Sequence, residues 1–475
     1  MQNFNNYIVR IETLGCRLNQ IESESIAKVF SENNFSINMN SVSASETEND
    51  NVLLVIVNTC TVTQKSEQKA RRIIRLLLKK CPTALIVVTG CYAQLNSADI
   101  NNIDNRIICV GGQIKSRIKQ IPELLCQNIQ NNWNVENLKN TILNSILTVP
   151  QEKKDFPEKS FELSTTSFIA HSRASLKIQD GCNNNCSYCA IHMARGHSVS
   201  LDVEEAIKRV VELESKGVEE VVLTTVNIAQ YKSAYNGQIV NFSKLLKLLL
   251  ASTKKISFRI SSLYPEIVDD DFCDAIKSDR VCPHFHISVQ SGSDKILKLM
   301  NRTYKKEDVV NACNKIKSVK ENPFLACDII TGFPGETEDD FLETMDLCNQ
   351  CGFCWIHAFP FSERKGTVAV TLKNKVPQEI SKIRCNKLNE WAMNQKINYI
   401  NANVGKERFA ILEVLRKPQY VYHCVTDNFL HCQVQFPKEK EELPQGTKVK
   451  ISIDSPLIEN VKKGGEVEAN AHIIF

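Results

Sequence analysis

Three cysteines in the middle of the sequence follow the spacing C-x3-C-x2-C. They are Cys182, Cys186 and Cys189, and the run between them is rich in asparagine. Thiolates at such spacing suit an iron–sulfur cluster. Because a cluster of four irons takes four ligands, three cysteines leave one iron open, much as a catalytic zinc keeps an exchangeable position. The motif therefore predicts an iron that can bind a small molecule and pass it an electron.

Three further cysteines, Cys16, Cys60 and Cys91, are far apart in the sequence but each follows a predicted strand. The predicted strands are residues 7–14, 52–58 and 84–89. In a parallel sheet such strand ends lie side by side, over the crevice where ligands bind. Glycines precede Cys16 and Cys91 and let the backbone approach a bulky cluster. The pattern predicts a second three-thiolate site, again with one iron open.

A third run, Cys348, Cys351 and Cys354, also has metal-like spacing. It lies where a predicted helix ends, Gly352 caps that helix and a strand begins at Trp355. Side chains at such a junction point in different directions. We therefore expect these three cysteines, and the ten others that lie outside all three runs, to be structural thiols.

The composition limits the cell compartment and the classes of partner that we expect for the protein. No apolar run reaches membrane length, and the polar N-terminus lacks the apolar stretch of a signal peptide. We expect a cytoplasmic protein with no membrane partner, in which the 19 cysteines are metal ligands and reduced thiols and not disulfides. The net charge of +4 permits a nucleic-acid partner but does not require one.

The 475 residues divide into three predicted domains and a linker. Residues 4–125 alternate strands with helices, which predicts a doubly wound parallel sheet. Residues 126–166 are rich in Asn, Gln, Lys and Ser and are predicted to be a linker with one helix. Residues 167–400 repeat strand–helix units, which predicts part of a parallel barrel with the Cys182 run on its C-terminal rim. Residues 404–475 offer five short strands and no helix, which predicts a small closed β-barrel of OB-like size.

These motifs resemble those of one family. The aromatic residue before Cys189 completes a run that is similar to the signature of radical S-adenosylmethionine (SAM) enzymes. Over nearly the whole chain the sequence resembles the methylthiotransferases, which are two-cluster radical SAM enzymes. The form of residues 176–182 is similar to the branch that acts on N6-threonylcarbamoyladenosine in tRNA, beside the anticodon. Further matching segments are residues 13–23, 57–63, 90–94, 194–196, 261–265, 290–294, 331–337 and 359–367.

The resemblance implies the domains, the cofactors and the reaction. It makes residues 4–125 the methylthiotransferase N-terminal domain, 167–400 the radical SAM core and 404–475 a TRAM domain, which recognises substrate. Two 4Fe-4S clusters are implied, one on each cysteine set. The core cluster would cleave SAM to a 5′-deoxyadenosyl radical that removes hydrogen from adenine C2. The second would deliver a methylated sulfur, and the monomeric enzyme would draw on an external electron donor and sulfur source.

Candidate contacts to the small molecule and to RNA follow from the same motifs. Tyr188, Ser262 and Gln290 are expected near SAM on the barrel rim. Two residues near that site, Thr225 and His192, depart from the family's usual glycine and proline. Separately, a predicted helix over residues 65–80 is basic, with Arg71, Arg72 and Arg75 among its cations. It suits RNA phosphates, although a solvated helix face would look the same.

Other readings stay open. Within the family, the substrate could be N6-isopentenyladenosine in tRNA or an aspartate of a ribosomal protein. The forms of residues 179–181 and 261–263 favour threonylcarbamoyladenosine. From another class, the chain could be an iron–sulfur protein that binds tRNA without catalysis, which a failure to cleave SAM to 5′-deoxyadenosine would reveal. Charge does not single out the last domain as an RNA binder, because its ten Lys and Arg balance ten Asp and Glu.

Overall fold

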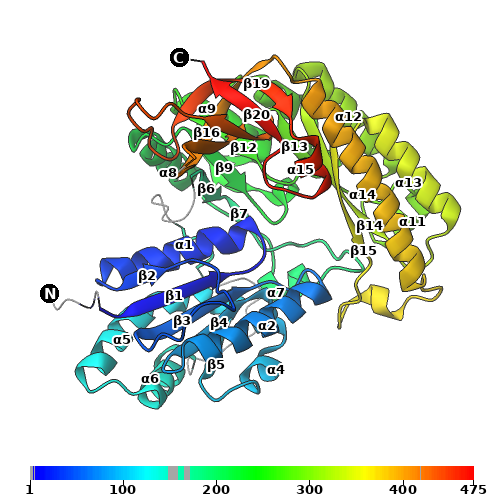
Figure 1. Cartoon of the computed structure of the whole chain (residues 1–475). Coiled ribbons are helices and arrows are strands. Elements are labelled where there is room, and N and C mark those ends of the chain that lie inside the picture. The colour runs from blue at the N-terminus through cyan, green and yellow to red at the C-terminus, as the bar shows by residue number, and fades with distance from the viewer. Residues whose placement is uncertain (1–3, 5, 148–158, 165–171, 418, 475) are drawn as a thin grey trace.

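The computed structural model describes residues 4, 6–147, 159–164, 172–417 and 419–474. Three units follow one another along the chain: an N-terminal layered sheet, a central partial barrel and a small C-terminal barrel (Figure 1). The predicted fold class is thus confirmed. Within the described ranges, no helix combines the length and apolarity needed to cross a membrane.

Five parallel strands form the N-terminal sheet, in the order β2-β1-β3-β4-β5. They are β1 (Ile8–Thr13), β2 (Ser36–Asn38), β3 (Val52–Thr59), β4 (Leu85–Gly90) and β5 (Ile107–Gly111). β3 and β4 are buried along their whole length, which explains their unbroken apolar runs. Helices cover both faces, as in a doubly wound fold.

One face of this sheet packs against α1 (Arg17–Glu32), α5 (Ile121–Gln130) and α6 (Val135–Ile142). The other packs against α2 (Gln64–Lys80), α3 (Cys91–Leu95) and α4 (Ser97–Asn101). A 3-10 segment, η1 (Gly112–Gln120), links β5 to α5. Figure 1 shows α1 on the side of the sheet that faces the other two units.

The predicted linker is wrong for residues up to 147. Helix α6 and the turn η2 (Leu143–Leu147) belong to the N-terminal unit. Leu138, Ile142 and Ile146 recur every four residues and are fully buried in its core. Many asparagines surround these residues on the exposed face of the helix. The polar composition of the segment therefore made its apolar stripe difficult to recognise in the sequence. Residues 148–158 and 165–166 lie outside the described residues.

Six parallel strands form the central unit, in two sheets ordered β12-β9-β6 and β13-β14-β15. Single bridges, Phe258 to Val281 and Leu263 to Ile287, connect the two sheets into a partial barrel. The strands are β6 (Ala174–Lys177), β9 (Glu220–Thr224), β12 (Ser257–Ile260), β13 (His284–Gln290), β14 (Phe324–Thr331) and β15 (Trp355–Pro360). The helices that follow them are α7 (Ile191–Arg195), α8 (Val203–Ser215), α9 (Phe242–Ser252), α10 (Asp270–Ile276), α11 (Asp294–Leu299), α12 (Lys306–Val319), α13 (Glu338–Cys351) and α14 (Gln378–Asn401).

The C-terminal unit is a closed barrel with the strand order β16-β17-β18-β20-β19. Its strands are β16 (Glu407–Arg416), β17 (Val421–Thr426), β18 (His431–Gln435), β19 (Lys448–Pro456) and β20 (Ala469–Ile473). The expectation of no helix in this unit is wrong, because one short helix, α15 (Ile458–Lys462), is present. It is too short to show a helical period in the sequence. Arg259 of the core docks this barrel by donating to the backbone carbonyls of Thr426 and Asp427, each at 3.0 Å.

A buried network of charges, the Glu22 network, joins the N-terminal unit to the core. Glu22 of α1 lies 2.5 Å from Lys115 of its own unit, and 3.2 Å from both Lys177 and Arg195 of the core. Asp180 lies 2.9 Å from the same two core cations. All five side chains are at most 7% exposed. Burial alone would raise the pKa of Glu22, but the charges of Lys115, Arg195 and Lys177 lower it well below its usual value.

We predict that Glu22→Gln, which keeps the shape and removes the charge, leaves Lys115 without an acidic partner and leaves Lys177 and Arg195 with Asp180 as their one remaining acid in the network. Breaking a buried ion pair by removing one partner costs about 3–5 kcal/mol. The urea midpoint of unfolding of the N-terminal unit and core should therefore fall strongly.

The matched control for this variant is Glu32→Gln at the end of the same helix. Glu32 is 60% exposed and makes only a surface pair with Lys28 at 3.7 Å, which should matter by less than about 1 kcal/mol. Equal midpoints for the two variants would show that the Glu22 network does not hold the units together.

Candidate functional site

The structure brings Cys16, Cys60 and Cys91 to one edge of the N-terminal sheet. Cys16 precedes α1, Cys60 directly follows β3, and Cys91 directly follows β4. Because β1, β3 and β4 are neighbours in the sheet, their carboxyl ends meet at this edge. Cys60 and Cys91 are buried and Cys16 is exposed.

Two glycines allow this close approach. Gly15 has φ +108°, and a side chain there would place its Cβ 2.5 Å from the Cβ of Cys60. Gly90 has φ +95°, and its Cβ would lie 2.3 Å from the carbonyl oxygen of Thr59. Both positions combine a left-handed backbone with no free space, so only glycine fits.

The core cysteines lie in the loop between two short elements on the same rim as the strand ends. The strand β7 (Gln179–Asp180), paired with β8 (Val199–Ser200), precedes Cys182, and α7 follows Cys189. Cys182 and Cys186 are buried and Cys189 is half-buried. Residues Asp180 and Arg195, which flank this loop, are two of the three core members of the Glu22 network.

Backbone amides point at the sulfur atoms in both sets. In three cases the backbone amide two residues after a cysteine donates to its sulfur. The distances are 3.5 Å for Cys60, 3.4 Å for Cys182 and 3.4 Å for Cys189. Such bonds favour thiolates. Burial nevertheless raises the pKa of Cys60 to about 11 and that of Cys189 to about 12. A bound metal charge would be needed to keep these sulfurs deprotonated.

The donor sets fit an iron–sulfur cluster. Among the described residues, no three His, Cys, Asp or Glu side chains are placed to hold a single metal ion. In a cluster each cysteine binds a different iron atom, so the ligands stand farther apart than those of one ion. Cysteine sulfur is the ligand that such clusters take.

Arg302 is a residue of this site that sequence reasoning missed. Its guanidinium lies 3.3 Å from the sulfur of Cys186 and donates to Ser288 O at 3.1 Å. It also stacks 4.5 Å from the ring centre of Tyr264 and 4.7 Å from that of Tyr304. The contact to Cys186 spans 116 residues, so no local pattern could have shown it.

The predicted SAM contacts all lie near the rim. Tyr188 is in the cysteine loop and packs edge-on against Phe333 at 6.3 Å. Ser262 follows β12, and Gln290 ends β13 with φ +72°. A positive φ is unusual for glutamine and typical of strained functional positions.

The two departures from the family pattern lie in the central unit, where the buried Nδ1 of His192 has no hydrogen-bond partner among the described residues. The hydroxyl of Thr225 lies 3.3 Å from that of Ser261. Burial lowers the pKa of His192, on α7, below its usual value.

The predicted basic helix is α2, and Thr63 caps its N-terminus. Arg72 and Arg75 are exposed on it. Arg71 is half-buried and donates to the hydroxyl of Tyr92 at 2.7 Å, so it supports the segment beside Cys91. Of the three arginines, Arg72 and Arg75 are the better placed to reach an external phosphate.

The third cysteine run is structural, as expected. Cys348, Cys351 and Cys354 are all buried, and Gly352 caps α13 with φ +61°. Cys348 and Cys351 belong to the apolar core of the central unit, whereas Cys354 faces the core under the C-terminal barrel.

Comparisons with known proteins agree with this architecture. Residues 176–348 match the Radical SAM superfamily, and residues 8–112 match "Uncharacterized protein family UPF0004". The chain is 41% identical over 465 residues to the threonylcarbamoyladenosine tRNA methylthiotransferase MtaB of Treponema pallidum, covering 89% of this chain and 94% of the relative. It is 32% identical over 453 residues to the Bacillus subtilis protein of that name, with 93% of each chain covered.

A relative with a different printed substrate is also similar. The tRNA-2-methylthio-N(6)-dimethylallyladenosine synthase of Lachnoclostridium phytofermentans is 30% identical over 383 residues, covering 80% of this chain and 78% of that one. The cysteine sites, the partial barrel and these similarities lead to one conclusion. The chain belongs to the MtaB group of tRNA methylthiotransferases, which are radical SAM enzymes.

Proposed function

We propose that this enzyme transfers a methylthio group to C2 of N6-threonylcarbamoyladenosine in tRNA, next to the anticodon. One observation carries the proposal: the Glu22 network joins the two three-cysteine sites. Glu22 lies on the helix that begins beside Cys16, and Asp180 and Arg195 flank the loop that holds Cys182. This connection supports the proposal that both sites act on one substrate.

The residues of the chain divide the work between the two sites. Cys182, Cys186 and Cys189 would hold the cluster that binds SAM, and Cys16, Cys60 and Cys91 the second cluster. When bound, these groups supply the radical that opens an unreactive C–H bond and the methylated sulfur that replaces its hydrogen. Arg302 sets a fixed positive charge against Cys186. Tyr188, Ser262 and Gln290 are proposed to orient SAM.

The concave face of the partial barrel supports a polar substrate. Alternate residues of β13 to β15 pack outward on the helices, among them Ile287 and Cys327, which turns His286, Asp328 and His357 to the opposite face. His286 lies 2.9 Å from Asp328, and its ring is 5.3 Å from that of His357. Such a polar surface suits the hydroxyl and amide groups of a threonylcarbamoyl group better than an apolar isopentenyl chain.

Other parts of the proposal concern partners and setting. The exposed Arg72 and Arg75 of α2 are proposed to contact tRNA phosphates. The C-terminal barrel is proposed to bind the RNA as a TRAM domain. We propose a monomer that works in the cytoplasm and takes electrons and sulfur from outside the chain.

The two cysteine sites should be separable by single substitutions. Cys182→Ala should abolish formation of 5′-deoxyadenosine, because SAM loses its anchoring cluster. Cys60→Ala should still form 5′-deoxyadenosine but yield no methylthio product. Chromatography of reaction mixtures from reconstituted protein measures both. Loss of SAM cleavage in folded Cys60→Ala protein would count against this division of roles.

The substrate assignment is tested with tRNA carrying a defined base. The enzyme should convert tRNA that carries N6-threonylcarbamoyladenosine and leave tRNA that carries N6-isopentenyladenosine unchanged, because polar groups on the concave face would stay unpaired against the apolar chain. Mass spectrometry of the nucleosides gives the answer. Preference for the isopentenyl substrate, or for a ribosomal protein, would show the assignment to be wrong.

A further inference from the structure

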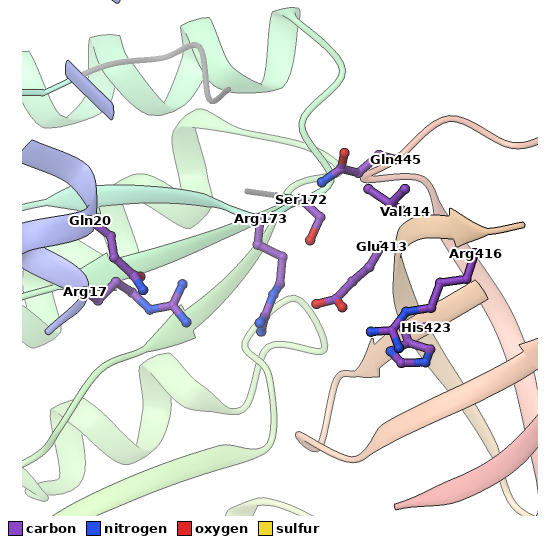
Figure 2. Close-up of a pocket in the computed structure, with 9 residues that line it drawn as sticks. All are labelled: Arg17, Gln20, Ser172, Arg173, Glu413, Val414, Arg416, His423 and Gln445. Atoms are coloured by element: carbon purple, nitrogen blue, oxygen red, sulfur yellow. The ribbon is translucent and has the colours of Figure 1, made fainter. Parts of the chain in front are cut away.

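A cavity of about 490 Å³ lies where the three units of the chain meet. Arg17 of α1 reaches it from the N-terminal unit, and Arg173, directly before β6, reaches it from the core. Glu413 and Arg416 of β16 and His423 of β17 line it from the C-terminal barrel. Figure 2 shows the guanidinium groups of Arg17 and Arg173 and the carboxylate of Glu413 turned toward the same space.

The two arginines on the inner side of this cavity lack a full set of partners. Among the described residues, the guanidinium of Arg17 makes one hydrogen bond, to the hydroxyl of Ser175 at a long 3.4 Å. Arg173 is 11% exposed, and its buried Nη1 finds no hydrogen-bond acceptor among the described residues. A buried donor without an acceptor is costly, so Arg173 favours an added anion, and Arg17 brings a second guanidinium group to the same cavity.

The acids nearby do not balance these charges. Glu220 is held by Arg259 through two bonds of 2.8 and 2.9 Å and lies 3.9 Å from Arg173. Glu413 is the second acid and faces Arg173. The charge of Arg259 also acts on Asp427, which lies 3.9 Å from Arg408. Four guanidinium groups, those of Arg17, Arg173, Arg259 and Arg408, thus share three carboxylates and leave one positive charge over.

The barrel side of the cavity adds a cation that is free to turn. Arg416 pairs with Glu466 at 3.4 Å, with side chains 55% and 84% exposed. A surface pair of this kind is weak, so Arg416 can exchange it for a ligand. Burial and the charge of Arg416 lower the pKa of His423, which is therefore neutral and available for hydrogen bonding at neutral pH.

We propose that this cavity binds a phosphodiester group of the RNA substrate, held by Arg17 and Arg173 and closed by Arg416. This inference rests on the proposed function. Planar guanidinium groups match phosphate oxygens in pairs. Arg17 directly follows Cys16, so a phosphate bound here would place the RNA backbone at a fixed distance from the N-terminal cysteines. The site also explains how a barrel with balanced charge takes part in RNA binding, because the other two units supply cations at its edge.

The test measures RNA affinity of the reconstituted holoenzyme against salt concentration. The probe is a labelled anticodon stem-loop RNA that carries N6-threonylcarbamoyladenosine, read by fluorescence anisotropy. Arg17→Gln and Arg173→Gln should each weaken binding at low salt by about tenfold or more, as expected for a charge-assisted hydrogen bond. Each should also reduce the salt slope by about one. Glu413→Gln should instead tighten binding, because the acid in the cavity is gone.

A matched control and a second ligand make the outcome decisive. Lys208→Gln removes one positive charge from α8, where the side chain is 76% exposed, and should leave RNA affinity unchanged.

Iron content shows whether Arg17→Gln disturbs Cys16. If it does, the RNA affinities of Arg173→Gln and Glu413→Gln decide the outcome. Unchanged RNA affinity in these variants, with normal binding by the wild type, would overturn the cavity proposal alone. Absence of RNA binding by the wild type would overturn the proposed function with it. If the arginine variants lose only the binding of inorganic phosphate, the site takes a free anion and the RNA assignment is wrong.

Discussion

The architecture of this enzyme depends on one carboxylate, Glu22, buried among cations from two units. It contacts Lys115 of its own unit and Lys177 and Arg195 of the core. Burying a charge is costly unless partners surround it, so the paired arrangement is stable only when the two units keep this relative position. The Glu22 network therefore sets the geometry between the N-terminal sheet and the partial barrel more strictly than apolar packing would.

That geometry has an electrostatic consequence for both cysteine sites. The network holds three cations against two acids, Glu22 and Asp180, and is positive overall. The charge of Arg195 lowers the pKa of Cys91 against the larger, opposing effect of burial. Arg302 places a second cation 3.3 Å from the sulfur of Cys186. Buried positive charge beside both sites suits the thiolates that each must provide.

Much of the fold and part of the site could be predicted from the sequence. Strand–helix alternation predicts the doubly wound sheet and the partial barrel, because strands and helices each show their own spacing of apolar residues in the sequence. The loop with Cys182 is a local motif. The position of Cys16, Cys60 and Cys91 at one edge followed from a general rule, that parallel strands end on the same side of a sheet.

What could not be predicted depends on contacts between distant residues. Glu22 and Arg195 are 173 positions apart, and Arg302 is 116 positions from Cys186. Neither pair of residues has a short sequence spacing from which the contact could be recognised. The cavity at Arg17 and Arg173 is built from three units and exists only once they are docked. The packing of helix α6 in the N-terminal core was missed for a different reason, since its narrow apolar stripe lies within a polar segment.

The central claim is that the Glu22 network fixes two cluster sites close to one another. Pulsed electron paramagnetic resonance of the reduced, reconstituted enzyme tests it most directly, by detecting the dipolar interaction between two clusters. The account predicts such an interaction in the wild type, and its loss when Cys182, Cys186 and Cys189 are replaced by alanine, with the signal of the other cluster retained. A wild-type spectrum from a single cluster, or from two clusters that do not interact, would contradict it.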